Sequence, residues 1–284
     1  MTEIHKLESG ELLARIEGES LERADLREMH LEGADLRGAN LRQALLQNAQ
    51  LTGADLQGAN LEGATLWGAT LNRANLSAAN LRHARLGVES GRNATMLLEC
   101  NLEGADLTSA DLRYVVLRES NLHRAILIRS DARNADLFHC NLQAATIRDA
   151  LLIRANLREA DLSTAVLEDC HLNDANLVNA KLRGTRLGSR HPDGFSVVKL
   201  ANFEGADLSN AILINLSAED ANLKSAILRN ADLRQAVLCG AILRRADVAG
   251  ANFEGVELAT VTMDFANFSQ ALNARIPSYK NNLR

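Results

Sequence analysis

Residues 34–58 read ADLRG ANLRQ ALLQN AQLTG ADLQG, five consecutive copies of one five-residue unit. The unit is Ala, a second position that is most often Asp or Asn, Leu, and two variable and mostly polar positions. It returns far along the chain, as in Ala155-Asn156-Leu157 and Ala231-Asp232-Leu233. Such a repeat predicts one continuous repeat body and makes chain length a poor measure of domain number.

A period of five fits neither an α-helix nor a flat strand. In a helix, positions five apart lie about 140° apart around the axis, so the leucines would spread over every face. In a strand, alternation by two would send successive leucines to opposite faces. The chain therefore turns a corner in each repeat, and four corners close a square coil of about twenty residues.

The fold class expected from this period is an all-β solenoid of about twelve coils, whose core is built from Leu and Ala. At the spacing of neighbouring strands, about 4.8 Å, twelve coils would span about 58 Å. Gly is frequent at the second corner position, where a positive φ carries no steric penalty. Representative core positions are Leu36, Leu56, Leu76, Leu107, Leu137, Leu157, Leu177, Leu208, Leu233 and Phe253.

Two breaks interrupt the period. Eleven residues separate the Leu positions 86 and 97, and sixteen separate Leu187 from Phe203, the next position counted in phase. Each interval is one more than a multiple of five, which predicts loops inserted near 87–95 and 188–199. The turn signal Pro192-Asp193-Gly194 supports the second loop.

The ends of the chain fall outside the repeat. We expect residues 1–15 to form an N-terminal cap, as a short helix or loop over the first coil, because an open solenoid end needs cover. The β-helix then occupies residues 16–268, and residues 269–284 form a C-terminal tail or cap without a clear apolar helix.

The A(D/N)LXX pattern, which runs from about residue 14 to residue 268, resembles that of the pentapeptide repeat family. The resemblance implies a right-handed quadrilateral parallel β-helix with capped ends. It also implies, for some members, a dimer joined end to end, so a homodimer through an end of the solenoid is one expectation. Known members range from gyrase-protecting proteins to regulators, and the fold therefore does not select a function.

Composition restricts the classes of partner. The net charge of −5 provides no basic stripe for a phosphate backbone, so direct binding of nucleic acid is not expected. No run approaches the roughly 20 apolar residues of a membrane span, and the N-terminus lacks the regions of a signal peptide. We therefore expect a cytoplasmic protein that does not bind membranes.

The repeat register also argues against a catalytic, cofactor or metal site. Cys100, Cys140 and Cys170 occupy the inward Ala position, and the first two lie two coils apart, too far for a disulfide. The histidines are scattered over outward and corner positions. We interpret the cysteines as small core residues and predict a non-enzymatic protein without a cofactor.

Apolar residues in outward positions of the middle run mark a candidate surface for a protein partner. They are Tyr114, Val116, Ile126, Ile128, Phe138, Leu151 and Ile153. Further candidates lie on the two predicted loops, because binding residues often sit on loops of rigid scaffolds. These are Arg92, Asn93, Arg190, His191, Asp193 and Phe195.

We therefore predict an interaction scaffold or regulator that presents an outer wall and two loops. The alternative, which comes from the resemblance, is a DNA-mimicking protein that binds gyrase or another topoisomerase and inhibits it or protects it from antibiotics. Duplex DNA of about 58 Å would carry about 34 charges. The net charge of −5 gives this alternative little support.

Overall fold

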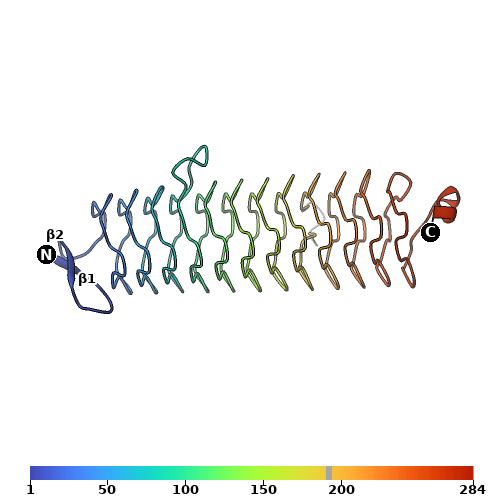
Figure 1. Cartoon of the computed structure of the whole chain (residues 1–284). Coiled ribbons are helices and arrows are strands. Elements are labelled where there is room, and N and C mark those ends of the chain that lie inside the picture. The colour runs from blue at the N-terminus through green and yellow to red at the C-terminus, as the bar shows by residue number, and fades with distance from the viewer. Residues whose placement is uncertain (190–193, 284) are drawn as a thin grey trace. The chain divides into compact units, whose positions relative to one another are not determined.

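The computed structural model describes residues 1–189 and 194–283, and it divides into two compact units, Met1–Ala145 and Thr146–Arg284. In each unit the backbone forms isolated parallel bridges between residues twenty apart, such as Asp35 with Asp55 and Asn156 with Asn176. Figure 1 shows the successive coils as stacked turns of the ribbon. Each unit is therefore all-β, and its chain forms the right-handed β-helix expected of pentapeptide repeats. We call one side of a stack a wall, and the segment of one coil on that wall a rung.

Hydrogen bonds explain why the repeat needs Asp or Asn before Leu. In the five-residue repeat 54–58, the Ala54 amide donates to the carbonyl of Leu51 within its own turn, at 3.0 Å. The Gln57 amide faces no neighbouring coil and donates instead to Oδ1 of Asp55, at 3.1 Å. The other three amides donate to adjacent coils at 2.7–2.9 Å; they belong to Asp55, Leu56 and Gly58. The short polar side chain thus supplies the one acceptor that the backbone lacks.

The second corner position adopts a positive φ at Gly and at many other residues alike. Gly58 has a φ of 63°, and Arg73 and Tyr114 have φ angles of 60° and 59°. Together with the Leu-to-Ala turn bond, this is the sign pattern of a type II turn. Gly is therefore favoured at the corner but is not required there.

The core consists of stacked Leu and Ala side chains. The ten core positions named from the sequence are all no more than 2% exposed. Their burial between neighbouring coils, rather than within one coil, explains how a chain with so few aromatic residues builds a continuous core.

The second break is shorter than the sequence count suggested. Val198 is fully buried, and its neighbour Val197 bridges His171 on the wall. After Leu187 the next residue in the Leu position is therefore Val198 and not Phe203, an interval of eleven residues, as at the first break. Since Val197 and Val198 are both apolar, their sequence does not show which one faces inward. The backbone pairing decides it.

The N-terminal segment is a β-hairpin and not the short helix or loop that we expected. Strands β1 (Thr2–His5) and β2 (Leu12–Ile16) pair antiparallel at the N-terminal end (Figure 1). The His5 carbonyl accepts the Asp35 amide at 2.8 Å, and Ile4 is buried. The hairpin is favoured because its own backbone pairs with the edge of the first coil, which a helix cannot do.

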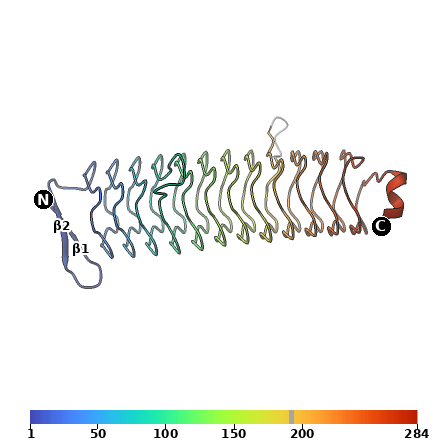
Figure 2. The ribbon, with the colours of Figure 1, turned by 45° about the horizontal axis from the view of Figure 1, so that its top comes forward.

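The C-terminal segment ends in a 3-10 helix, η1 (Ser278–Leu283), shown at the red end of the ribbon in Figure 2. The ammonium of Lys280 lies 2.6 Å from the Val261 carbonyl and 3.2 Å from the Leu258 carbonyl. The Tyr279 hydroxyl donates to the Ala259 carbonyl at 3.1 Å. These side chains bind backbone carbonyls of the last coil, in addition to the turn bond that the Leu258 carbonyl accepts from the Val261 amide.

Candidate interaction surfaces

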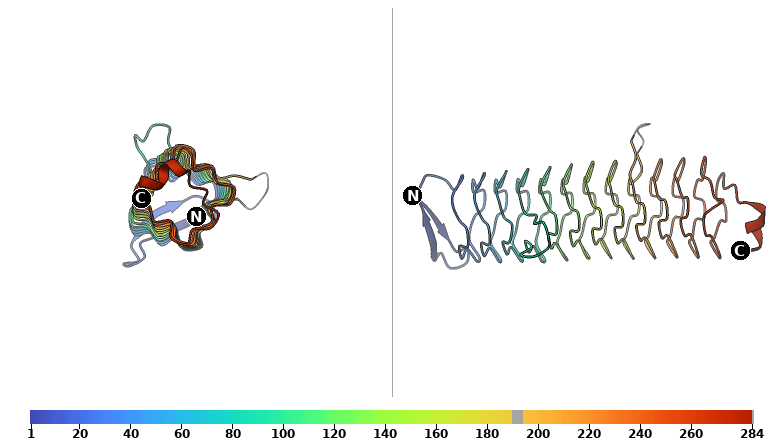
Figure 3. Two further views of the ribbon diagram at one scale, coloured as in Figure 1. Left: turned by 90° about the vertical axis from the view of Figure 1, so that its right-hand side faces the viewer. Right: turned by 90° about the horizontal axis from the view of Figure 1, so that it is seen from above.

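The first inserted segment, residues 87–95, projects from the wall of the N-terminal unit in green (Figure 3). Its base is fixed by the buried Thr95, whose hydroxyl oxygen lies 2.6 Å from the Leu86 carbonyl oxygen and accepts the Gly68 amide at 3.1 Å. At its other end the Val88 amide donates to the Arg113 carbonyl at 3.1 Å. The segment is therefore held at both ends.

The exposed residues Arg92 and Asn93 are presented by this segment, which packs on Tyr114. A Cβ atom added to Gly91 would lie 3.3 Å from the Tyr114 ring, so the two approach closely. Gly91 also has a φ of 69°, which a side chain would strain. The structure thus brings Arg92, Asn93 and Tyr114 into one region.

A half-buried apolar surface begins directly beside this segment. Met96 bridges Val116, and Val116 bridges Asp136, so three successive rungs of one wall stand side by side. Phe138 lies on the third of these rungs, with the Arg118 guanidinium 4.9 Å from the centre of its ring. We call Met96, Leu98, Val116 and Phe138 the Phe138 face. Sequence reasoning missed Met96 and Leu98 because they follow immediately after the break.

The other apolar candidates lie elsewhere. Ile126 bridges Asp106, ten residues from Val116, and two corners separate the walls, so Ile126 and Ile128 are on the side opposite the Phe138 face. Leu151 and Ile153 belong to the C-terminal unit. All seven outward apolar residues are half-buried rather than exposed. The Arg118 guanidinium, for example, lies over the ring of Phe138.

More exposed apolar side chains occur in the C-terminal unit. Phe195, which follows the second break, is 55% exposed, and Leu200 nearby is 53% exposed. The predicted loop residues Arg190, His191 and Asp193 lie outside the described residues. Leu200 occupies the second corner position, where most residues are polar or Gly, and sequence reasoning overlooked this signal. Other exposed apolar residues that it overlooked are Ile227, Val237, Ile242, Phe265 and Leu272.

Some acidic residues of the walls are paired with an arginine on the same rung, and others with a basic residue of a neighbouring coil, as Asp106 is with Arg82. In Asp25-Leu26-Arg27, Nε and Nη2 of Arg27 donate to the two carboxylate oxygens of Asp25 at 2.8 and 2.6 Å. The hydrogen bond from Arg27 lowers the pKa of Asp25 to about 2. The same Asp-x-Arg pairing occurs at Asp35, Asp111, Asp131 and Asp232. These walls therefore carry less unpaired negative charge than their Asp content suggests.

The inward cysteines Cys100, Cys140 and Cys170 are buried and form no disulfide bonds. The Sγ atoms of Cys100 and Cys140 lie 2.9 Å from the carbonyls of Leu71 and Leu117, and Sγ of Cys170 contacts the Ile147 carbonyl. Burial raises the pKa of each of these thiols to about 12. They are therefore protonated core residues and not nucleophiles.

Other kinds of site are not apparent in the described part of the chain. Within residues 1–189 and 194–283, no three side chains of His, Cys, Asp or Glu gather closely enough to hold a metal ion. The helices found in those residues are also too short or too polar to span a membrane.

Comparison with known families identifies the class of protein. The family model described as pentapeptide repeats matches eight segments of the chain, which are residues 20–58, 54–87, 100–137, 116–152, 150–188, 201–240, 219–255 and 241–272. The chain belongs to the pentapeptide repeat family. Proteins of this family are in general structural or binding proteins rather than enzymes.

Solved structures of several pentapeptide repeat proteins are similar to this chain. HetL of the cyanobacterium Nostoc, described as involved in heterocyst differentiation regulation, is 32% identical, with 76% of this chain and 88% of HetL covered and a TM-score of 0.45. Rfr23 of the cyanobacterium Cyanothece is 29% identical, with coverages of 36% and 63% and a TM-score of 0.21. Full-length QnrB1, described as a plasmid-mediated fluoroquinolone resistance protein, is 13% identical, with coverages of 77% and 94% and a TM-score of 0.30. None of the curated proteins compared with the chain matches it.

Proposed function

We propose that this protein is a non-enzymatic scaffold or regulator that binds a protein partner through the Phe138 face and the inserted segment 87–95. The observation that carries the proposal is the placement of Met96, Val116 and Phe138 on adjacent rungs beside a segment fixed by Thr95. Aromatic and Met side chains next to an Arg are typical of the centre of protein interfaces. A rigid wall also loses little conformational entropy on binding.

The chain contains its own control for this proposal. Ile126 and Ile128 are half-buried apolar residues on the opposite wall of the same unit. Val116→Asp and Phe138→Asp should each abolish capture of a partner, while Ile126→Asp and Ile128→Asp should retain it. All four variants place one carboxylate on a half-buried outward position, so their effects on folding should be similar.

The experiment is affinity capture from a lysate with quantitative mass spectrometry, together with thermal unfolding of every variant. A partner supports the proposal only if it is lost with both variants of the Phe138 face and kept with both controls. Equal capture by all five proteins, or equal loss in both pairs of variants, would refute binding through this face.

The alternative partner is a DNA gyrase or another topoisomerase, which the family resemblance suggests. The two breaks in the repeat favour it, since gyrase-protecting members also carry two projecting loops. The Asp-x-Arg pairs weigh against imitation of DNA, because they neutralise carboxylates within their own rungs. A supercoiling assay with micromolar protein tests it. If the protein neither inhibits gyrase nor rescues it from a quinolone, this partner is excluded.

A further inference from the structure

Among the described residues of the C-terminal unit, the backbone ladder opens between the rungs of Val237 and Glu257. On the rung before, the Ala218 amide donates to the Val237 carbonyl and the Val237 amide to the Leu216 carbonyl, both at 2.8 Å. In the next pair of rungs, among the described residues, neither the Leu238 amide nor the Glu257 amide has a backbone partner. Two bonds of the regular pattern are thus missing.

The opening is confined to this wall. On the following wall of the same two coils, the Leu243 amide donates to the Thr262 carbonyl at 2.6 Å and the Thr262 amide to the Ala241 carbonyl at 2.9 Å. The last coil is therefore paired normally beyond its next corner. Fraying of the whole chain end does not explain a gap on a single wall.

A third bond of the pattern is replaced rather than lost. Elsewhere on this wall the second corner residue donates to a carbonyl of the next coil, as Asp220 does to Cys239 at 2.9 Å. Gly240 instead donates to Oγ1 of Thr260 at 3.2 Å. The carbonyl that it would meet by register is that of Ala259, which accepts the Tyr279 hydroxyl.

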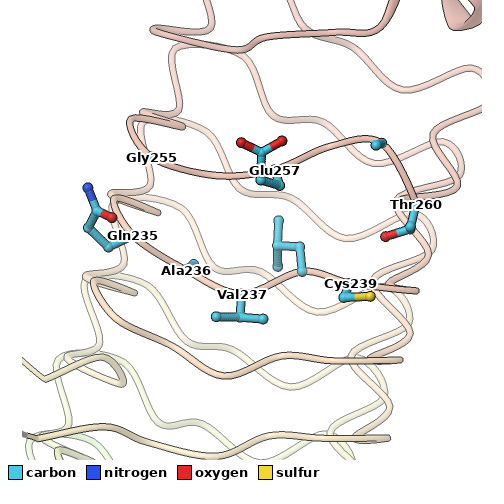
Figure 4. Close-up of a pocket in the computed structure, with 9 residues that line it drawn as sticks. Gln235, Ala236, Val237, Cys239, Gly255, Glu257 and Thr260 are labelled. Atoms are coloured by element: carbon cyan, nitrogen blue, oxygen red, sulfur yellow. The ribbon is translucent and has the colours of Figure 1, made fainter.

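The C-terminal segment thus holds the carbonyls of the displaced rung. Tyr279 binds Ala259, and the Lys280 ammonium lies 3.2 Å from the Leu258 carbonyl. Between the separated rungs lies an open pocket of about 380 Å³ (Figure 4). Val237 and Cys239 line it from one rung, and Glu257 and Thr260 from the other.

We infer that the C-terminal segment and the Val237 rung compete for the rung of Glu257, so that the pocket exists only while Tyr279 and Lys280 are docked. Release of the segment frees the Ala259 carbonyl for Gly240 and lets Leu238 and Glu257 complete the ladder. A molecule that occupies the pocket favours the docked segment, and one that binds the segment closes the pocket. Docking or release of Tyr279 and Lys280 therefore opens or closes the pocket between the rungs of Val237 and Glu257, and we call this segment the latch.

Hydrogen–deuterium exchange of the full-length chain tests this inference. The test variant is Tyr279→Phe with Lys280→Met, and the control is Lys224→Met, which removes a paired lysine elsewhere in the same unit. Peptides that contain Leu238, Gly240 and Glu257 report on the gap, and peptides that contain Ala218 and Leu243 report on normal pairing. Deletion of residues 277–284 provides a second test variant.

In the two test variants, exchange of the Leu238 and Glu257 amides should become slower by about tenfold, which corresponds to about 1.4 kcal/mol, because each gains a ladder bond. Exchange at Ala218 should not change. If the segment is only an end cap, its loss should instead speed exchange at Glu257 and Leu243 together. Unchanged or faster exchange at Leu238 and Glu257 refutes the latch.

Discussion

The hydroxyl oxygen of Thr95 lies 2.6 Å from the carbonyl oxygen of Leu86 and joins the two ends of the first inserted segment. Thr95 occupies a position that is Ala in most repeats and is fully buried there. Ser196 has the same place after the second break, where its hydroxyl lies 3.1 Å from the Leu167 carbonyl. The Thr95 hydroxyl also lies 3.1 Å from the Leu66 carbonyl, so at both breaks a small hydroxyl residue in the Ala position contacts the preceding coil.

Replacement of Thr95 should show how much the hydrogen bonds of its hydroxyl group contribute to the free energy of unfolding. Thr95→Val keeps the volume but leaves the Gly68 amide and the Leu86 carbonyl without this partner, which should lower the free energy of unfolding by about 1–3 kcal/mol. Thr95→Ser keeps the hydroxyl and should cost much less. Urea denaturation measures both, and equal stability of the two variants would show that the hydroxyl bonds contribute little.

The length of the first insertion should be adjustable by a fixed amount. Deletion of the six residues 88–93 brings Leu86 and Leu97 to the normal spacing of five and leaves Ala94 at the corner, a residue type that Ala78 already shows in that conformation. The melting temperature should stay close to that of the wild type, because a shorter loop costs less to close.

Deletion of only residues 88–92 is the matched control for this experiment. It leaves one residue too many between Leu86 and Leu97, and that residue must distort the corner. Its melting temperature should fall below that of the six-residue deletion. The opposite order would contradict the register assigned to this break.

The second position of the repeat should require an acceptor rather than a charge. Oδ1 of Asn121 accepts the His123 amide at 3.1 Å and Nδ2 of Asn141 at 2.9 Å. Asn121→Ala should lower the free energy of unfolding by about 1–2 kcal/mol, since it removes both acceptor contacts. Asn121→Asp keeps the acceptor and loses only the Nδ2 bond to Oδ1 of Asn101 at 3.1 Å, so it should cost less than Asn121→Ala. Chemical denaturation of the two variants distinguishes these outcomes.

The buried thiols should make the protein sensitive to alkali. Thiols in the unfolded chain ionise near their ordinary pKa of 9.0, whereas burial raises the pKa of Cys100, Cys140 and Cys170 to about 12. Their contribution to stability is therefore complete below pH 9. It decreases as the pH rises from 9 towards 12, by up to about 1.4 kcal/mol per pH unit for each thiol.

The variant with all three of these cysteines changed to Ala tests this prediction, because Ala is the usual residue at that position. Urea denaturation at pH 8 and pH 10 should show a smaller decrease for the variant than for the wild type. Equal decreases would mean that the thiols ionise in the folded protein. In the folded wild type at pH 8, a thiol reagent should modify the exposed Cys239 before the other three.

The repeat predicts the fold because its period leaves one geometry that buries every Leu. It also predicts Asp or Asn beside the backbone, and Asp55 shows the contact that this requires. It does not predict the second break correctly, because Val197 and Val198 are both apolar and only pairing with His171 separates them. The hairpin formed by Thr2–His5 and Leu12–Ile16 is also missed, since strands this short show no clear alternation.

The candidate surface could be predicted only in part. Val116 and Phe138 are recognised from the sequence because they lie one coil apart in an unbroken run. Met96 joins them only when the register across the break is known. The gap at Glu257 has no counterpart in the sequence pattern, because it depends on contacts from Tyr279 and Lys280, which lie outside the repeat.

The pairing of Asp25 with Arg27, and of Asp35 with Arg37, is completed within a single rung. No partner from another coil is required, so each pair is carried by one short stretch of the gene. Duplication or loss of a coil that holds such a pair would copy or remove both charges of the pair together. Such a coil could therefore be gained or lost during evolution without leaving either charge of the pair alone on the wall.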